Sequence, residues 1–458
     1  MQAMKWSILA LAVAAGTTQL AFADQQSESK GFVEDSKLTL LNRNYYFNRS
    51  AESSTSRNGQ GVKRAHDPRS WSQGFLMDYS SGFTQGTVGV GVDAFGYLGL
   101  KLDGGAGHAG SGNLPTENNG AQKDEYSTAG AAVKVRVSNT VLKYGNLQPT
   151  SPVFALGGSR LLPQTGTGFM LTSEEIKDLF LEAGHFTAAR DRTDTYHNGN
   201  IGAGYTSYTT QDGVSGNKVT SSTADYVGGK YKITDQLSSS LYYGRLQDVW
   251  NQYYANLNYV QPLSANQSLT FDANYYLTKD TGSSEAGDID NNAFSLAAAY
   301  SIDAHTFTLA FQKVNGDTPF DYVGAGGKGA TSLGSGGDSI FLANSVQYSD
   351  FNAPGEKSWQ ARYDLNMATL GVPGLSFMVR YVRGTGIEET NNSFYAGQGY
   401  QDGDKERETN FEAKYKVQSG PAKDLSFRVR QSWYRSEGGI ADSVNEFRLI
   451  TEYPLNIL

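Results

Sequence analysis

The sequence contains no cysteine, and several other features common in proteins are scarce. The missing thiols exclude disulfides, cysteine-ligated zinc and thiol catalysis. Hydrophobic residues make up 38% of the 458 residues, less than the roughly 45–50% of ordinary soluble domains. No apolar run of about 20 residues occurs beyond the first two dozen positions, which excludes a bundle of transmembrane helices. Basic residues are in deficit, giving a formal net charge of −8, so no nucleic-acid partner is expected.

Aromatic residues and glycine are abundant instead, with 28 Tyr, 22 Phe and 53 Gly. A disordered chain of this polarity would be poor in aromatics. At about 150 residues per domain, the length corresponds to about three globular domains, yet the chain has few apolar residues to fill three cores. Length, polarity and aromatic content together favour one large, extended all-β architecture.

The first segment has the features of a cleavable export signal. Lys5 supplies a positive start, residues 6–15 form an apolar stretch, and Ala21-Phe22-Ala23 fits the small-x-small cleavage rule. The alternative, a membrane anchor, would need a longer apolar stretch. We therefore expect residues 1–23 to be a signal peptide and residues 24–458 to be a single exported domain from a Gram-negative bacterium.

Most of the remaining chain alternates apolar and polar residues in segments of about 10–14 residues separated by Gly, Asn, Asp and Ser clusters. Clear examples are the segments around 269–277, 359–367, 375–381 and 425–433. Alternate side chains of a strand point to opposite faces, so each segment has one apolar face and one polar face. A soluble sandwich would show the same alternation.

Two features favour a membrane barrel over a sandwich. The polar face carries long charged residues in nearly every segment, and aromatic doublets such as Tyr242-Tyr243 and Tyr253-Tyr254 stand near segment ends, as interfacial girdles would require. In lipid the sheet must close on itself, because an open edge leaves backbone groups unsatisfied. We expect a transmembrane antiparallel β-barrel of about 18 strands, wide enough for an aqueous channel.

Short and long connections alternate along the chain, as in outer-membrane barrels with short periplasmic turns and long outer loops. Two long connections are too apolar to remain in water. Segment 146–176 contains Val153, Phe154, Leu161 and Leu162, and we expect it to fold into the lumen as a constriction loop. The long outer loop 314–356 should be partly inward as well, through residues 338–347. A flap over the rim or a subunit contact remains the alternative for both.

Basic residues recur on the face that should line the lumen. The alternation places there Lys134, Arg136, Arg362, Arg380, Lys414, Lys416, Arg428, Arg430 and Arg448, with Arg43 as a weaker candidate because its strand is apolar on both faces. Most belong to the last five segments, which are neighbours in a meander. Residues two apart on one strand are about 7 Å apart, so these side chains would form a row along one side of the pore.

A row of guanidinium groups would guide carboxylates. Arginine binds carboxylates bidentately and keeps its charge. A carboxylate ~4 Å from one cation gains roughly 1 kcal/mol in water and ~4 kcal/mol at an effective dielectric of 20, which enriches a solute without trapping it. The alternative is that the arginines only pair with acids on the same face, for which Asp364, Glu412 and Glu446 are available.

Enzyme, metal and cofactor motifs are absent from the pattern. The chain has five histidines, His66, His108, His185, His197 and His305, and none has a local serine or aspartate partner of the kind a catalytic site needs. Asp288 to Asn292 resembles the start of a calcium loop but has Ala293 where glycine is required. We expect no enzyme activity, no metal and no cofactor.

Several long runs resemble one protein family. Residues 145–161 (GNLQPTSPVFALGGSRL), Pro163-Gln164-Thr165, residues 181–187, residues 339–349 (SIFLANSVQYS), residues 354–359 and Asn445-Glu446-Phe447-Arg448 are similar to the porin D (OprD) family. The resemblance covers essentially the whole chain after the signal peptide. It implies an 18-stranded barrel with an inward third loop and a basic ladder, and a selective channel for solutes that carry a carboxylate.

Carried over by this resemblance, Arg160 in the constriction loop joins the ladder, and Ser159 borders the narrowest point. The family has one branch that takes basic amino acids and another that takes cyclic or aromatic acids such as benzoate and vanillate. Residues 95–104 and 453–458 look more like the second branch. We therefore expect passive uptake of small monocarboxylates, with aromatic acids as the first hypothesis and basic amino acids as the second.

Other expectations concern partners and rival classes. The barrel should contact outer-membrane lipid and lipopolysaccharide, and family members associate weakly as trimers. The rival classes are a non-conducting structural or adhesive barrel, a barrel enzyme and a receptor driven by an energy-coupling partner. The last would need a large N-terminal plug domain, whereas strand patterning starts near Ser36.

Overall fold

The computed structural model describes residues 24–53, 67–105, 107–206, 218–328, 334–438 and 440–458. The expected signal peptide, residues 1–23, lies outside these described residues, as do parts of five of the connections between barrel strands. Within the described ranges, no helix has the length and apolar character needed to cross a membrane.

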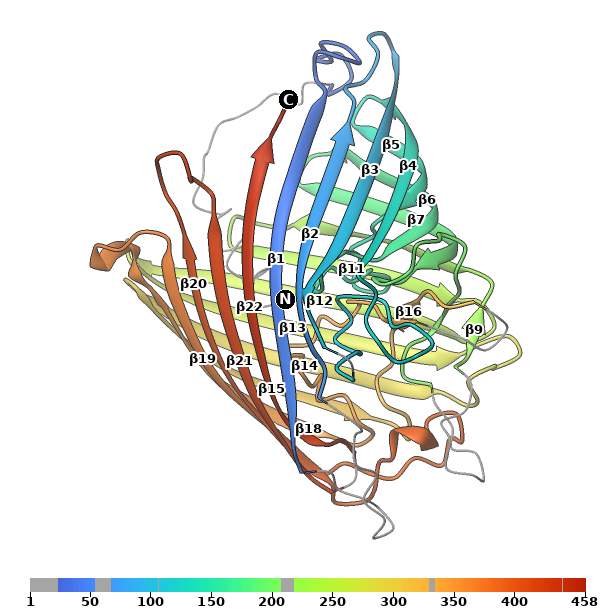
Figure 1. Ribbon diagram of the computed structural model, residues 1–458, viewed down its shortest axis with the longest axis vertical. Coiled ribbons are helices and arrows are strands. Elements are labelled where there is room, and N and C mark those ends of the chain that lie inside the picture. The colour runs from blue at the N-terminus through green and yellow to red at the C-terminus, as the bar shows by residue number, and fades with distance from the viewer. Residues whose placement is uncertain (1–23, 54–66, 106, 207–217, 329–333, 439) are drawn as a thin grey trace.

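Eighteen antiparallel strands form one continuous sheet that closes on itself, as Figure 1 shows. Each strand pairs with the next along the chain, and β1 pairs with β22 over the range from Thr39↔Asn456 to Ser53↔Ser443. The barrel strands are β1 (Lys37–Ser53), β2 (Arg69–Ser80), β3 (Val88–Asp103), β4 (Glu125–Val137), β5 (Thr140–Leu147), β6 (Thr165–Ile176), β7 (Leu179–Arg190), β10 (Ala224–Lys232), β11 (Leu237–Leu246), β12 (Trp250–Ser264), β13 (Gln267–Asp280), β14 (Asp290–Ile302), β15 (His305–Asn315), β18 (Lys357–Asn366), β19 (Leu375–Thr385), β20 (Lys405–Lys416), β21 (Ser426–Glu437) and β22 (Ser443–Asn456).

The predicted alternation of faces is present in the strands. In β21, Phe427 and Trp433 are exposed on the outer face, whereas Arg430 and Ser432 are buried on the inner face. Exposed apolar side chains of this kind occur on the outside of most strands, where lipid covers them. The closed 18-stranded all-β barrel expected from the sequence is therefore confirmed.

The aromatic doublets are divided between the two faces, which differs from the expected girdle. Tyr243, Tyr253 and Tyr275 face outward. Their neighbours Tyr242, Tyr254 and Tyr276 are buried inside the barrel. Successive residues of a strand point to opposite faces, so a doublet cannot place both rings in the lipid interface. The inward rings instead form the wall against which the inward loops pack.

The connections alternate in length as predicted. Ser138-Asn139 joins β4 to β5, and Asp303-Ala304 joins β14 to β15, with Ser138 and Asp303 at φ angles of 53° and 50°. Such left-handed backbone is typical of tight hairpin turns. The turn between β18 and β19 contains a single turn of 3-10 helix, η1 (Met367–Leu370). A second, η2 (Ala396–Gln398), lies in the long connection between β19 and β20.

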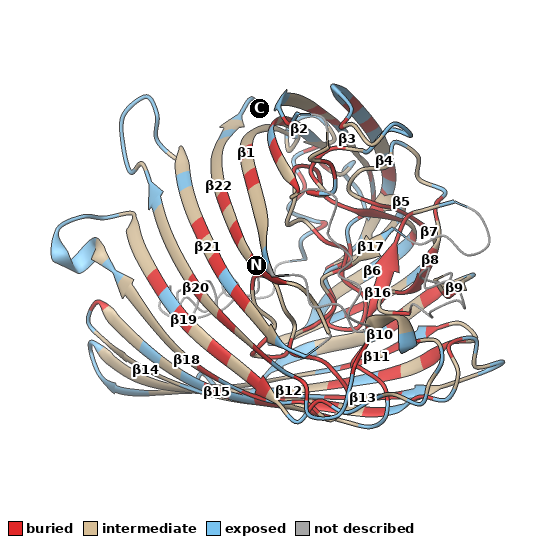
Figure 2. Cartoon of the chain, turned by 60° about the horizontal axis from the view of Figure 1, so that its bottom comes forward, coloured by how far each residue is buried: buried red, intermediate tan, exposed pale blue. Residues whose placement is uncertain are grey.

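The long connections form structure of their own inside and above the barrel. A small four-stranded sheet joins two outer loops through β8 (Ile201–Ala203), β9 (Thr220–Ser221), β16 (Val323–Ala325) and β17 (Ser335–Gly336). Figure 2 shows that buried residues gather on the inner wall and on these inward segments. The hydrophobic core of this protein is therefore the contact between the loops and the inner wall, not the space between two sheets.

The constriction loop is shorter than the expected range 146–176. It spans residues 148–164, because Thr165–Ile176 forms β6. The apolar residues Phe169 and Leu171 of that range are exposed on the outer face of β6, so their hydrophobicity serves the lipid contact. Only the apolar residues up to Leu162 serve inward packing.

Candidate solute path and its constriction

The constriction loop crosses the lumen from one wall to the other. At its first half, Val153, Phe154 and Leu156 join a buried cluster with the inner faces of β7 and β10–β13. Phe154 lies 4.9 Å from Phe186 between ring centroids. At its second half, Leu161 and Leu162 belong to a separate cluster with aromatic residues of β1, β3 and β4. Because opposite walls hold its two ends, the loop divides the lumen instead of lying along one side.

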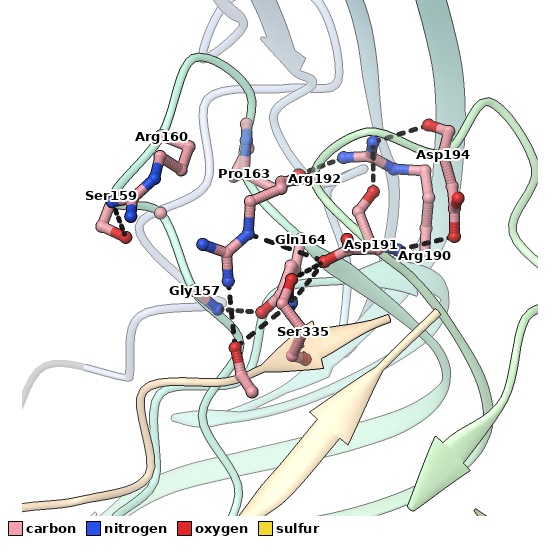
Figure 3. Close-up of polar contacts among 12 residues, drawn as sticks. Gly157, Ser159, Arg160, Pro163, Gln164, Arg190, Asp191, Arg192, Asp194 and Ser335 are labelled. Atoms are coloured by element: carbon pink, nitrogen blue, oxygen red, sulfur yellow. Dashed lines mark hydrogen bonds and ion pairs between the residues drawn. The ribbon is translucent and has the colours of Figure 1, made fainter. Parts of the chain in front are cut away.

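A buried polar clamp fixes the second half of the loop, as Figure 3 shows. Gln164 exchanges hydrogen bonds with Gly157 across the loop, and its amide donates to the Asp191 carboxylate at 2.8 Å. The fully buried Arg190 donates to the backbone carbonyls of Pro163, Asp191 and Asp194. Ser335 of the long outer loop also donates to Asp191. The clamp thus connects three chain segments through satisfied buried polar groups.

Residues 338–350 form the second inward segment. Ala155 and residues 338–339 exchange hydrogen bonds, including Asp338 N to Ala155 O at 2.9 Å. Ile340 and Leu342 are buried against the inner wall. Further along, the backbone amides of Tyr348 and Ser349 donate to Glu408 on β20. This segment therefore holds the constriction loop and then crosses to the opposite wall.

The inner faces of β18–β22 carry a group of cations that we call the basic wall: Arg362, Arg380, Lys414, Arg428, Arg430 and Arg448. Register places Arg362 opposite Arg380, Lys414 opposite Arg428, and Arg430 opposite Arg448. Directly opposite side chains in an antiparallel pair lie on the same face with Cβ atoms about 5 Å apart. The last strands therefore bring together the residues that the sequence alternation selected.

Acids on the same face neutralise this wall only in part. Glu412 accepts both Arg428 and Arg430, at 2.6 and 3.1 Å. Glu446 accepts both Arg448 and Arg49, each at 2.5 Å. Two carboxylates are thus shared by four guanidinium groups. Arg380 donates to the neutral side chain of Asn410 at 2.9 Å. Asp364, Glu406 and Glu408 also lie on the inner face of these strands, so the wall is a network of shared charges and not a row of bare cations.

Arg160 adds a cation from the constriction loop. Its Nε donates to Ser111 O at 3.0 Å, and its guanidinium lies over the Phe47 ring, as do those of Arg49 and Arg448. Burial, followed by repulsion from Arg448, lowers the pKa of Arg160 to about 9. The side chain stays charged at neutral pH, and the acid that acts on it, Glu446, is already shared by Arg448 and Arg49. Ser159 lies beside it, with its hydroxyl at 3.5 Å from Arg160 Nη1.

Carboxylates face the lumen from the long outer loop. Asp350 accepts hydrogen bonds from the hydroxyls of Tyr205 and Tyr322, both at 2.8 Å, and from Ser345 at 2.5 Å. Asp338 accepts from Gly158 N at 3.4 Å, next to Ser159. These three hydroxyl groups are neutral, and both carboxylates are partly exposed. Asp338 thus brings a carboxylate to the constriction loop two residues before Arg160.

Asp321 is a buried junction above the constriction. Its carboxylate accepts the backbone amides of Tyr205 and Tyr322 and the hydroxyl of Tyr395, which come from three outer loops. Burial raises the pKa of Asp321 to about 6, partly offset by these hydrogen bonds and by Lys218. With only 3% of its surface exposed, Asp321 positions the loops and does not meet solute.

The remaining predicted residues lie elsewhere or are neutralised. Lys134 is buried and bonded to Asp93, and Arg136 donates to Gln26 and stacks on Phe83, on β4, which β1–β3 separate from β22. Lys416 pairs with Asp424 near a short turn. Arg362 pairs with Asp364, and Arg43 pairs with Glu452. Arg43 nevertheless donates to the carbonyls of Arg160 and Leu161, which places it inward and beneath the constriction loop.

Sequence reasoning missed four contributors: Arg49, Arg192, Asp338 and Asp350. Arg49 shares the inward parity of Tyr45 and Phe47, so the alternation of β1 could have indicated it. The other three belong to loops, where no periodicity shows which way a side chain points. Arg192 donates to Gly336 O at 3.0 Å and completes the clamp.

No cluster of three or more His, Asp or Glu residues suited to a metal occurs in the described ranges.

A closed barrel with an apolar outside, a polar lumen and an inward constriction is a transmembrane channel. A sequence profile of the family described as "outer membrane porin, OprD family" matches residues 30–457. The chain therefore belongs to the OprD family of outer-membrane porins, and its homologues are channels, not enzymes.

Individual relatives support this assignment over the full length. Porin D of Pseudomonas aeruginosa is 58% identical over 468 residues, with 100% of both chains covered. The porin-like protein GalP of Pseudomonas putida is 35% identical, with 94% of this chain and 95% of that protein covered. Among solved structures, Pseudomonas aeruginosa OprD is 55% identical with a TM-score of 0.78, covering 95% of this chain and 99% of the other. Pseudomonas aeruginosa OpdK, solved with vanillate, is 33% identical with a TM-score of 0.78, covering 93% and 100%.

Proposed function

We propose that the channel passively admits small carboxylates that also carry a cationic group, with basic amino acids as the main class. The carboxylate moves along the basic wall past Arg160, while the cationic group of the solute meets Asp350 and Asp338. The observation that carries the proposal is the meeting of both charge signs at the constriction. An electrically uniform lumen would select for one charge and would not orient a zwitterion.

The positive side of the path is suited to transient carboxylate binding. Glu412 and Glu446 each accept two guanidinium groups, so none of these four arginines has a carboxylate to itself. A passing carboxylate competes with these acids for the guanidinium groups. Each arginine then exchanges one carboxylate partner for another, and the solute does not bind tightly. Multiple weak sites of this kind allow both selection and release.

The negative side favours basic amino acids over aromatic acids. Asp350 is held by three neutral donors, which fix its position without cancelling its charge. A benzoate-like solute would gain from the basic wall alone and would be repelled by this carboxylate. The identity to OpdK, the relative solved with vanillate, is only 33%, which gives the aromatic-acid hypothesis limited support.

Two sets of variants test the two halves of the path in liposomes containing purified protein. Arg160→Gln and the double change Arg428→Gln with Arg430→Gln should each cut the initial uptake of arginine and of benzoate by about three- to tenfold, since each tenfold corresponds to about 1.4 kcal/mol of lost interaction. Asp350→Asn should cut the uptake of arginine and leave that of benzoate equal or raised. Arg245→Gln, on the outer face of β11, is the matched control.

Competition between solutes identifies the preferred class. Unlabelled arginine should reduce labelled arginine uptake at lower concentration than benzoate does. If benzoate competes better and Asp350→Asn has no effect on arginine, the channel prefers aromatic acids. Arginine uptake that is unchanged in all the lumen variants would exclude the two-sided path.

A further inference from the structure

The outer face of the barrel carries a second group of cations that the solute path does not use. We call it the outer basic belt: Lys313, Lys357, Arg383, Arg407 and Arg435, one from each of β15, β18, β19, β20 and β21. These strands are sequential neighbours in the sheet (Figure 1). Each residue shares its face with an outward apolar or aromatic side chain two or four positions away: Phe311, Trp359, Val379, Phe411 and Trp433.

The belt places like charges directly opposite one another. Register pairs Lys313 with Lys357, Arg383 with Arg407, and Arg407 with Arg435. Like charges at directly opposite positions destabilise a sheet. Within the part of the chain that the structure describes, Arg383 makes no side-chain hydrogen bond or ion pair, and Arg407 has Glu437 at 2.9 Å with both side chains more than 40% exposed. The arrangement therefore has a positive excess that this chain does not neutralise.

The belt lies at the level where lipid headgroups begin. Lys357 is the first residue of β18, immediately after the long outer loop, and Arg383 is two residues before the end of β19, so the belt is at the long-loop end of the barrel. Trp359 and Tyr381, with ring centroids 5.3 Å apart, lie next to it on the side of the membrane centre. Aromatic rings of this kind mark the interface of a membrane barrel.

The outward basic side chains at the same end of β7–β14 have acidic partners. Lys279 on β13 pairs with Asp290 on β14, and His185 on β7 lies 2.6 Å from Asp225 on β10. These outward groups alternate in sign across neighbouring strands. The positive charge of β15–β21 has no such balance. This difference indicates a localised binding surface on these strands, because a rim that merely faces water would look alike all round the barrel.

We propose that the outer basic belt binds the phosphate groups of lipopolysaccharide in the outer leaflet. Guanidinium groups bind phosphate bidentately, and two neighbouring arginines on adjacent strands are spaced to share one phosphate. The apolar face on the membrane side of the belt would contact the acyl chains of the same lipid. One lipopolysaccharide molecule would then bind both the cations and the apolar side chains of this surface. Bound phosphate would also relieve the repulsion between the opposed arginines.

The test compares the purified full-length channel with the variant Arg383→Gln/Arg407→Gln/Arg435→Gln in detergent, with and without added lipid A. Phosphorylated lipid A should raise the melting temperature of the unmodified channel, and dephosphorylated lipid A should raise it much less. In the triple variant at least half of the phosphate-dependent increase should disappear. Without lipid, the single variant Arg383→Gln should be at least as stable as the unmodified channel, because Arg383 makes no side-chain hydrogen bond or ion pair in the described part of the chain and its repulsion with Arg407 is removed.

Lys279→Gln is the matched control, since it removes an outward cation of the same barrel end that already has an acidic partner. It should keep the full response to phosphorylated lipid A. The single variant Arg383→Gln provides a second measurement and should show an intermediate response. Equal stabilisation by the two forms of lipid A, an unchanged response of the triple variant, or an equal loss in Lys279→Gln would each overturn the proposal. Arginine uptake should be unaffected in all these variants, which separates this surface from the solute path.

Discussion

At the scale of single residues, the buried carboxyl of Asp321 holds three outer loops together. Its two oxygens accept hydrogen bonds from Tyr205, Tyr322 and Tyr395, and the first and last of these are 116 and 74 residues away in sequence. A carboxylate can accept several hydrogen bonds at once, which suits a junction of backbone amides. Its burial, however, disfavours the charged form and raises its pKa to about 6.

This pKa predicts that the loop junction depends on pH. The folded carboxyl has a higher pKa than the ordinary value of 3.8, so the folded form binds the proton more tightly than the open form. The junction is therefore most stable below pH about 4 and loses stability as the pH rises to about 6, by roughly 3 kcal/mol in total for a shift of about two pKa units. Hydrogen exchange of the amides of Tyr205 and Tyr322, corrected for intrinsic rates, should be faster at pH 7 than at pH 5.

Asp321→Asn should remove this dependence, because the asparagine oxygen still accepts the two amides and no proton is exchanged. Asp288→Asn, in a neighbouring outer loop, is the control and should keep the difference between pH 5 and pH 7. Exchange in the unmodified channel that is independent of pH over this range would show that Asp321 does not govern the junction.

At the scale of elements, the inward loops depend on the inner faces of strands that also face lipid. Tyr276 of β13 shows how closely the two roles are connected. Its hydroxyl donates to Pro152 O of the constriction loop at 3.1 Å and accepts from Phe341 N of the second inward segment at 3.0 Å. One side chain thus fixes both segments that narrow the lumen. Its neighbour Tyr275 is 44% exposed on the outer face.

Tyr276→Phe should therefore loosen both segments while leaving the barrel intact. The change removes two buried hydrogen bonds worth about 1 kcal/mol each. Single-channel recordings should show more frequent conductance fluctuations and a less uniform open level. Tyr275→Phe is the matched control on the same strand and should record as the unmodified channel does. Identical traces for both variants would mean that the wall contacts of Val153 and Phe154 alone hold the loop.

At the scale of the whole molecule, periodic features could be predicted from sequence and aperiodic ones could not. The alternation in β21 placed Arg428 and Arg430 inward correctly, because a strand has only two faces and one of them is covered by lipid. In β1 both faces are rich in apolar residues, which weakens the alternation, and Arg49 was missed although it shares the inward parity of Tyr45 and Phe47. The contacts of Asp321 and Asp350 join segments far apart in sequence, and only the folded loops bring them together.

Closure of the barrel is the property on which every other feature depends, and β22 completes it. Leu449 pairs with Tyr46 on β1 and with Val429 on β21, in the middle of the seam. Proline there removes a ladder hydrogen bond, and in lipid each unsatisfied backbone group costs several kcal/mol. Pro454 is tolerated in the same strand because it lies near the end, opposite Leu41.

Leu449→Pro should therefore prevent closure, and Leu449→Ile should not. Folded barrels migrate faster than heated ones in a denaturing gel, so the unheated isoleucine variant should show the fast band and the proline variant should show only the slow one. Refolding into vesicles of matched thickness gives the second measurement. A heat-sensitive fast band for Leu449→Pro would show that the β1–β22 seam accepts a missing hydrogen bond, in which case closure rests more on side-chain contacts such as Tyr46 with Phe447 than on the backbone ladder.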